Sequence, residues 1–142
     1  MQEIVINRRF GGFGLSHKAV MRYAKLKGIK LYPYLDEITK KVWIKYHKDK
    51  ISIDKIAEGN FGIIHYSTKK PTSERLVNAN YFSERDIKRD DQILIKVVRE
   101  MGKKANGKYA NLKVVKIPDG INYEIDEYDG IESIHEVHNT WR

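Results

Sequence analysis

The chain has 142 residues, of which 41% are hydrophobic and 32% are charged, and its formal net charge is +8. This length and balance predict a single globular domain over residues 1–142, large enough to fold without a metal or a disulfide. The absence of cysteine excludes thiolate catalysis, cysteine-ligated metal centres and disulfide scaffolds. No apolar run reaches the ~18–20 residues of a membrane helix, and the first residues are unlike a signal peptide, so we expect a cytoplasmic protein without membrane contact.

Charge is distributed unevenly along the chain. Residues 119–142 contain seven acidic residues and one basic residue, so residues 1–118 carry a net charge of +14. A body this basic favours anionic partners such as nucleotides, phosphate esters or nucleic acid. Lysine-rich surfaces also serve solubility alone, and the acidic end could neutralise the basic body, so net charge by itself does not predict a polyanion ligand.

The first thirty residues predict a strand, a glycine-rich loop and a helix. Residues 3–7 (EIVIN) form a β-branched run that is typical of a strand. The loop RRFGGFGL follows, and Ser16 is placed to cap a helix over residues 17–27. Gly28 then tolerates the left-handed backbone conformation that commonly ends a helix.

The middle of the chain, residues 31–78, predicts an insertion that contains a β-hairpin or a small meander. Residues 42–47 (VWIKYH) and 61–67 (FGIIHYS) are typical of strands, with turn residues between them. Residues 68–80 lack periodicity and predict a surface loop.

The last third of the chain predicts a helix and then three strands. Asp90 or Asp91 caps the helix, and apolar residues recur at three- and four-residue spacing as far as Ala105. The fold class is therefore α+β, with an antiparallel-rich sheet packed against two principal helices. The strands are predicted over residues 112–117, 121–128 and 131–137, separated by turns at Pro118–Gly120 and Asp129–Gly130.

The glycine-rich loop is the first candidate binding site. Successive glycines let the backbone approach a ligand closely, and a turn into a helix directs N–H groups at an anion. Arginines add positive charge, and phenylalanine rings offer faces that stack on a base. The spacing fits neither a Walker loop nor a dinucleotide fingerprint, so a tight turn with both phenylalanines in the core is the alternative. The candidate residues are Arg8, Arg9, Phe10, Gly11, Gly12, Phe13 and Ser16.

A second candidate site precedes the second predicted helix. Tyr81 and Phe82 could stack on a base. Arg89 and Asp91 could bind phosphate or ribose. In the alternative interpretation Asp90 or Asp91 only caps the helix, which leaves the aromatic pair unexplained.

The C-terminal histidines form a third, weaker candidate. Glu132 and His135, or His135 and His138, could meet on a helical turn as metal ligands or as an acid–base pair. The HExxH pattern is absent, so we expect no metal and interpret the cluster, with Trp141 and Arg142, as an edge presented to a partner subunit. Neighbouring helix residues do not face each other, so Ser16 and His17 do not form a nucleophile–base pair. We expect a protein that is not an enzyme.

Three segments resemble one family of small phage-encoded proteins. They are IVINRRFGGFGLS, the run RDDQILIKVVREMG followed by ANGKYANLKVVKIPDGINYEIDEYDGIESIHE, and the closing HNTW. The family is the first-described type of Thoeris anti-defence sponge, whose members sequester cyclic ADP-ribose isomers made by bacterial TIR proteins. The resemblance covers residues 3–30 and 79–142 and leaves residues 31–78 unaligned.

The resemblance implies a homo-oligomer, a dimer or a hexamer, with ligand pockets at subunit interfaces and no cofactor, in the cytoplasm of the infected bacterial host. Some members also bind cyclic oligonucleotides. Phe82 (or Tyr81) and Asp91 match the family's pocket positions best, although asparagine is more usual at the position of Asp91. Asn139 stands where the family usually has an arginine, which weakens an anion-binding role for that end.

Residues and resemblance together favour a sponge that binds a cyclic ADP-ribose-type nucleotide without degrading it. Sequestration requires burial and complementary charge but no preference for a transition state, which suits a chain without an evident catalytic set. The alternative is a basic nucleic-acid-binding protein, indicated by the charge of +14 over residues 1–118. A phosphodiesterase or glycohydrolase acting on the same ligand is a third hypothesis.

Overall fold

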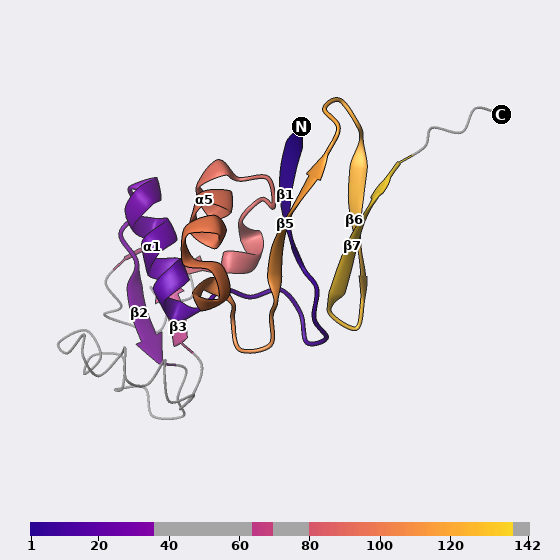
Figure 1. Ribbon diagram of the computed structural model, residues 1–142. Helices are drawn as coiled ribbons and strands as arrows, with labels where there is room; N and C mark the ends of the chain where they lie inside the picture. Colours follow the sequence, from indigo (N-terminus) through magenta and orange to yellow (C-terminus); the bar gives the residue numbers. More distant parts are fainter. Residues whose placement is uncertain (36–63, 70–79, 138–142) are drawn as a thin grey trace. The chain divides into compact units, whose positions relative to one another are not determined.

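A computed structural model describes residues 1–35, 64–69 and 80–137 (Figure 1). The chain divides into two compact units, Met1–Ala19 with Ile87–Arg142, and Val20–Asp86. We call them unit 1 and unit 2 and describe each by itself. The prediction of one domain over residues 1–142 stays a prediction.

Unit 1 is built on an antiparallel pair formed by β1 (Gln2–Asn7) and β5 (Leu112–Ile117). Val5 lies opposite Val114 in this pair. Helix α5 (Gln92–Met101) packs against both strands. The β-branched and aliphatic side chains of β1 and α5 form the centre of its core, which includes the fully buried Ile4, Val5, Leu94 and Val97.

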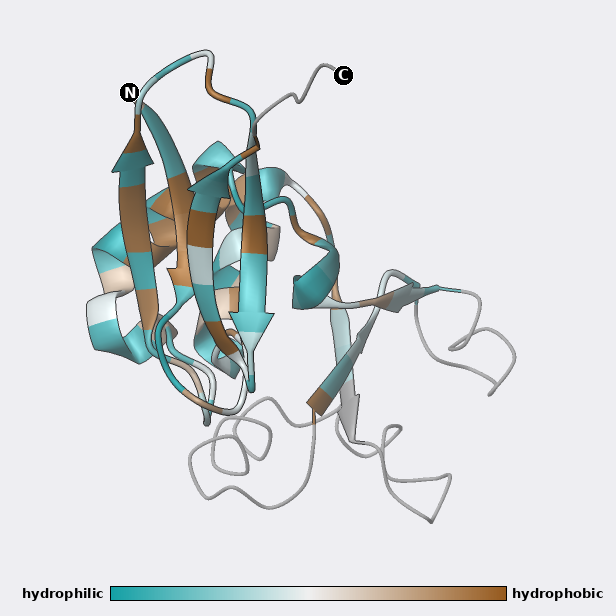
Figure 2. Cartoon of the chain, turned by 90° about the vertical axis from the view of Figure 1, so that its right-hand side faces the viewer, coloured by the Kyte–Doolittle hydropathy of each residue, from teal (hydrophilic) through white to brown (hydrophobic). Residues whose placement is uncertain are grey.

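A hairpin of β6 (Tyr123–Tyr128) and β7 (Ile131–Glu136) completes the strands of unit 1. Asp129 and Gly130 join the two strands with φ angles of 49° and 92°, the combination that two-residue type I′ turns require. The backbone N–H of Asn7, at the end of β1, donates to a carboxylate oxygen of Glu132 on β7 at 2.8 Å. Figure 2 shows the two strand pairs side by side.

The two α-helices of the described residues begin at the predicted side-chain caps. The Ser16 hydroxyl accepts from the backbone N–H of Ala19 at 3.2 Å, at the start of α1 (His17–Lys27), and Gly28 follows the helix with φ 78°. Asp91 accepts from the N–H groups of Ile93 and Leu94 at the start of α5. The end of α5 tightens into the 3₁₀ helix η2 (Gly102–Ala105).

Unit 2 contains the antiparallel strands β2 (Tyr32–Leu35), β3 (Ile64–Ser67) and β4 (Tyr81–Phe82), in the order β2-β3-β4. A short 3₁₀ helix, η1 (Glu84–Asp86), follows β4. Tyr66 is buried on β3, and burial together with the negative charge of Glu84 raises the pKa of its phenol well above the usual value.

The α+β class with antiparallel sheets is confirmed for the described residues, which contain two α-helices and seven strands. The strand expected from residue 121 begins at Tyr123, and the Ile121 carbonyl before it accepts from the Gln2 side chain. Residues 42–47, most of the expected loop 68–80 and the remainder of the expected insertion hairpin lie outside the described residues.

Candidate ligand-binding site

Three connections meet at one end of the unit 1 strands: residues 8–16 after β1, residues 106–111 before β5, and the turn between β6 and β7 (Figure 1). Backbone hydrogen bonds join them. The N–H of Arg8 donates to the Asn111 carbonyl at 2.9 Å, and the N–H of Gly11 donates to the Asp129 carbonyl at 3.1 Å. We call these three connections the loop end.

Glycines let the loop-end backbones touch one another. Gly11 and Gly12 have φ angles of 115° and 109°, which L side chains rarely adopt. A Cβ on Gly130 would lie 2.6 Å from the backbone nitrogen of Gly11, and a Cβ on Gly107 would lie 2.8 Å from the carbonyl carbon of Gly14. The glycine-rich loop is therefore a backbone packing element, as the tight-turn interpretation proposes for its glycines.

Large aromatic side chains extend from the loop end into solvent. Phe10 is 57% exposed, Tyr109 is 56% exposed, and Tyr128, at the end of β6, is 79% exposed. Tyr109 and the glycine-rich loop are in contact, because a Cβ on Gly11 would meet the Tyr109 side chain. Exposed rings are costly in water unless a partner covers them, so their concentration here marks a candidate contact surface.

Positive side chains accompany these rings. Arg9 is exposed and donates to the Lys108 carbonyl at 3.4 Å. The Lys108 ammonium is exposed too and lies 5.3 Å from the centre of the Tyr109 ring. Arg8 donates one guanidinium N–H to the Glu132 carbonyl at 2.8 Å, and its fork offers further donors. The loop end thus combines flat apolar faces with cations.

Two of the candidate residues, Arg89 and Phe13, lie in the interior of unit 1 and not on the exposed surface of the loop end. Arg89 forms a two-pronged ion pair with Glu132, with N–O distances of 2.5 and 2.8 Å, and Glu132 is only 5% exposed. The Arg89 guanidinium carbon lies 3.7 Å from the centre of the buried Phe13 ring. Arg89 and Phe13 therefore already have an intramolecular counter-charge and stacking partner.

Ser16 and Asp91 serve the backbone. The Ser16 hydroxyl donates to the Lys104 carbonyl at 2.6 Å while it caps α1, and one Asp91 carboxylate oxygen receives both N–H bonds at the start of α5. These contacts match the capping interpretation of both residues. Their predicted contacts with a ligand stay predictions.

Phe82 belongs to unit 2. Its ring stacks beside Tyr23 with centroids 6.5 Å apart and 30° between the ring planes. Tyr81, its neighbour on β4, is exposed and lies 5.8 Å from the His65 ring. The predicted role of Phe82 in ligand binding stays a prediction.

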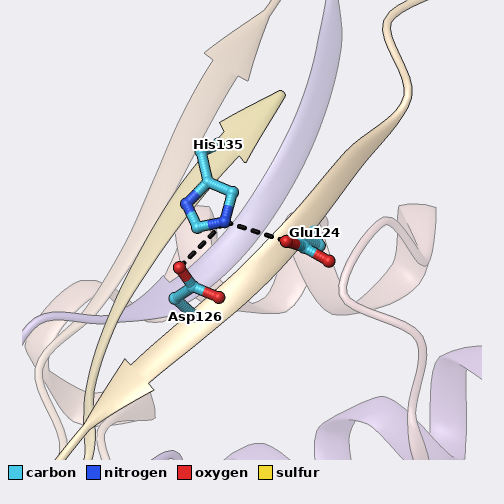
Figure 3. Close-up of side chains that lie close together, drawn as sticks. All are labelled: Glu124, Asp126 and His135. Carbon is cyan, nitrogen blue, oxygen red and sulfur yellow. Dashed lines mark hydrogen bonds and ion pairs between the residues drawn. The ribbon is translucent and has the colours of Figure 1, made fainter. Parts of the chain in front are cut away.

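The C-terminal cluster differs from the prediction. Residues 131–136 are a strand, so Glu132 and His135 point to opposite faces and do not meet on a helical turn. His135 instead lies beside Glu124 and Asp126 of β6 (Figure 3), at 3.0 and 2.8 Å. His138, Trp141 and Arg142 lie outside the described residues.

Sequence reasoning missed Tyr109 and Tyr128 at the loop end and the grouping of Glu124 with Asp126 and His135. The grouping of Glu124, Asp126 and His135 could have been predicted from the alternation within residues 123–128 and the two-residue turn. Together these two signals fix which side chains face each other across the hairpin. Tyr109 carries no such signal, since it lies in a loop.

Comparison with known proteins adds no assignment: no family model matches the chain, and neither a curated protein nor a solved structure gives a match. Among the described residues, no helix has the length and apolarity needed to cross a membrane.

Proposed function

We propose that this chain is a nucleotide sponge, which binds cyclic ADP-ribose-type signalling molecules made by TIR proteins and holds them without degrading them. In this role it blocks immune signalling in the cytoplasm of an infected bacterium, as the resemblance of its sequence to Thoeris anti-defence proteins implies. The observation that carries the proposal is the loop end, where exposed aromatic rings and cations extend from connections joined by backbone hydrogen bonds and close glycine contacts.

The cations of the loop end suit the pyrophosphate of such a ligand. Arg9 and Lys108 come from two different connections, and the exposed Arg9 guanidinium donates to the backbone carbonyl of the exposed Lys108, so both cationic residues lie at the loop end. A guanidinium fork offers two parallel donors to phosphate oxygens, and an ammonium adds a compact charge. Arg8 supplies a third positive group on the same loop.

The rings suit the base of the ligand. Phe10 and Tyr109 both expose more than half of their surface, and every nucleobase has a face that can stack on them. A purine stacked on one of these rings would replace exposed apolar surface with a buried contact. Stacking is tolerant of base identity, which fits the binding of both cyclic ADP-ribose isomers and cyclic oligonucleotides.

Preorganisation is the physical requirement of a sponge. A ligand is held tightly when the binding groups lose little freedom on contact, and the loop end is already connected by backbone hydrogen bonds between its three connections. No bond of the ligand has to be broken, so binding energy need not be reserved for a transition state. The Ser16 hydroxyl is engaged in capping α1, which agrees with a role in structure instead of nucleophilic attack.

We propose further that the chain works as a homo-oligomer, a dimer or a hexamer. Exposed rings such as Phe10 and Tyr128 cover only one side of a small ligand, and a neighbouring copy would enclose the other. Enclosure between copies would also remove these rings from water in the assembled state.

The test is calorimetric titration of the full chain with individual cyclic ADP-ribose isomers, followed by heat denaturation and chromatography of the released ligand. We expect tight binding, recovery of the ligand intact, and a loss of affinity of about 5- to 150-fold for Phe10→Ala, the equivalent of ~1–3 kcal/mol of stacking. Val137→Ala, a substitution of an exposed apolar residue after β7, is the matched control and should leave affinity unchanged.

Three results would refute the proposal. Recovery of a cleaved ligand would identify an enzyme. Tight binding of duplex or single-stranded DNA that weakens steeply between low and physiological salt, with no binding of the small nucleotides, would identify the nucleic-acid-binding alternative. Equal affinities of the Phe10→Ala variant and the unchanged protein would remove the loop end from the site.

A further inference from the structure

The outer face of the β6–β7 hairpin brings an imidazole and two carboxylates together (Figure 3). The Nε2 atom of His135 lies 3.0 Å from Oε1 of Glu124 and 2.8 Å from Oδ2 of Asp126. The three potential ligand atoms lie within 4.8 Å of one another, and all three side chains are exposed. We call Glu124, Asp126 and His135 the hairpin cluster.

The hairpin fixes this arrangement through its register. Glu124 is directly opposite His135 in the antiparallel ladder, and Asp126 lies two residues further along β6, on the same face. The two-residue turn at Asp129 and Gly130 fixes the register of β6 against β7. A shift of the register by one residue would place the members of the cluster on opposite faces. The backbone therefore presents all three side chains together before any ion binds.

The chemistry of the cluster suits a divalent cation better than a hydrogen bond alone. One nitrogen atom faces two carboxylate oxygens, whereas a neutral imidazole has a single N–H to donate. A protonated imidazole would leave one negative charge uncompensated. A divalent ion with a neutral imidazole and two carboxylates gives a neutral set.

The geometry points to zinc. Zinc takes imidazole nitrogen and carboxylate oxygen at about 2.0–2.2 Å in a tetrahedral arrangement, which separates neighbouring ligand atoms by about 3.3 Å. The two distances from His135 Nε2, 3.0 and 2.8 Å, need to open by a few tenths of an ångström, and exposed side chains can make this adjustment. Magnesium, which prefers oxygen ligands and keeps its waters, suits the imidazole poorly.

We propose that Glu124, Asp126 and His135 bind one Zn²⁺ ion, with water in the fourth position. The ion would link the two strands of the hairpin across the face opposite to Glu132, which is buried against Arg89. The site is independent of the proposed function, because Glu124, Asp126 and His135 are not among the residues assigned to nucleotide binding.

The test is calorimetric titration of the full chain, purified without a histidine tag, with ZnCl₂ and separately with MgCl₂. We expect one equivalent of Zn²⁺ to bind and Mg²⁺ to give no heat at the same concentration. His135→Gln should weaken zinc binding by more than about 100-fold, beyond the 10- to 100-fold typical of losing an outer partner of a ligand. Two matched controls, His17→Gln on α1 and Glu127→Gln on the other face of β6, should bind zinc as the unchanged protein does.

Nuclear magnetic resonance gives a second measurement that does not depend on the variants. The imidazole signals of His135 should shift on addition of one equivalent of Zn²⁺, while those of His17 stay in place. No zinc binding by the unchanged chain, or equal affinity in the His135→Gln variant, would overturn the proposal and leave the hairpin cluster as an ion-paired surface group.

Discussion

The ion pair between Arg89 and Glu132 makes a quantitative prediction about the stability of unit 1. Replacing Glu132 with Gln removes the negative charge but keeps a side-chain oxygen that can accept from the backbone N–H of Asn7. The substitution therefore removes the charge and, because an amide nitrogen replaces the second carboxylate oxygen, also removes the acceptor of one Arg89 guanidinium N–H. It leaves the Arg89 guanidinium, whose side chain is 18% exposed, without its counter-ion.

The magnitude follows from burial. Removing one partner of a buried pair costs ~3–5 kcal/mol, because the remaining charge stays out of water without compensation. Contact of the Arg89 guanidinium with the Phe13 ring and its 3.3 Å bond to the Val5 carbonyl offset part of this cost. We expect Glu132→Gln to lower the free energy of unfolding by about 3 kcal/mol, at the lower end of that range.

Urea denaturation followed by circular dichroism measures this loss, as a lower midpoint at an unchanged denaturant dependence. The control is Glu127→Gln, an exposed residue on β6 that should change stability by less than about 0.5 kcal/mol. The double variant Arg89→Met with Glu132→Gln should lose less than Glu132→Gln alone, because it leaves no unpaired charge. A loss below ~1 kcal/mol for Glu132→Gln, or a double variant that loses the sum of both single changes, would refute the burial argument.

Four other outcomes are expected. Gly130→Ala should destabilise the chain by more than ~1 kcal/mol, measured by thermal unfolding, because its φ of 92° and its contact with the glycine-rich loop both exclude a Cβ; an unchanged midpoint would contradict this. Asp91→Ala should lower the free energy of unfolding by ~0.5–2 kcal/mol, because the helix loses its cap. Asp91→Asn, which keeps a capping oxygen, should lose much less in the same urea assay. Above pH 10 the Tyr66 phenol ionises in the unfolded chain but keeps its proton in the folded chain, so the free energy of unfolding should fall with rising pH. Tyr66→Phe should make this fall less steep, and parallel stability curves for the variant and the unchanged protein would contradict the prediction. The sequence prediction that Phe82, in place of a loop-end ring, stacks on the base expects Phe82→Ala to weaken binding of cyclic ADP-ribose by about 5- to 150-fold, the equivalent of ~1–3 kcal/mol, and unaltered calorimetric affinity in a folded variant would exclude Phe82 from the site.

Local signals made parts of the fold predictable. Helix α1 has the predicted bounds, residues 17–27, because the Ser16 hydroxyl at its start and Gly28 at its end act within one turn of the chain. The turn at Asp129 and Gly130 was predictable for the same reason, since its backbone angles depend on two adjacent residues.

Contacts between distant residues could not be predicted in this way. Arg89 and Glu132 are separated by 43 positions, and the sequence places them in different candidate sites. They meet in the structure because β7 packs beside β1. Phe10 and Phe13 flank the same glycines, yet one is exposed and the other is buried. Their sequence spacing gives no information on which ring faces the core, because loop residues have no fixed periodicity.

At the loop end, different residues determine the path of the backbone and the side chains on the surface. Gly11, Gly14, Gly107 and Gly130 determine how the main chain is arranged, and none of them contributes a side chain to the surface. Phe10 and Tyr109 lie beside these glycines, and more than half of each side chain faces water. Under the proposed function, single substitutions of these exposed rings would change which ligand is bound, while the glycine framework stays constant.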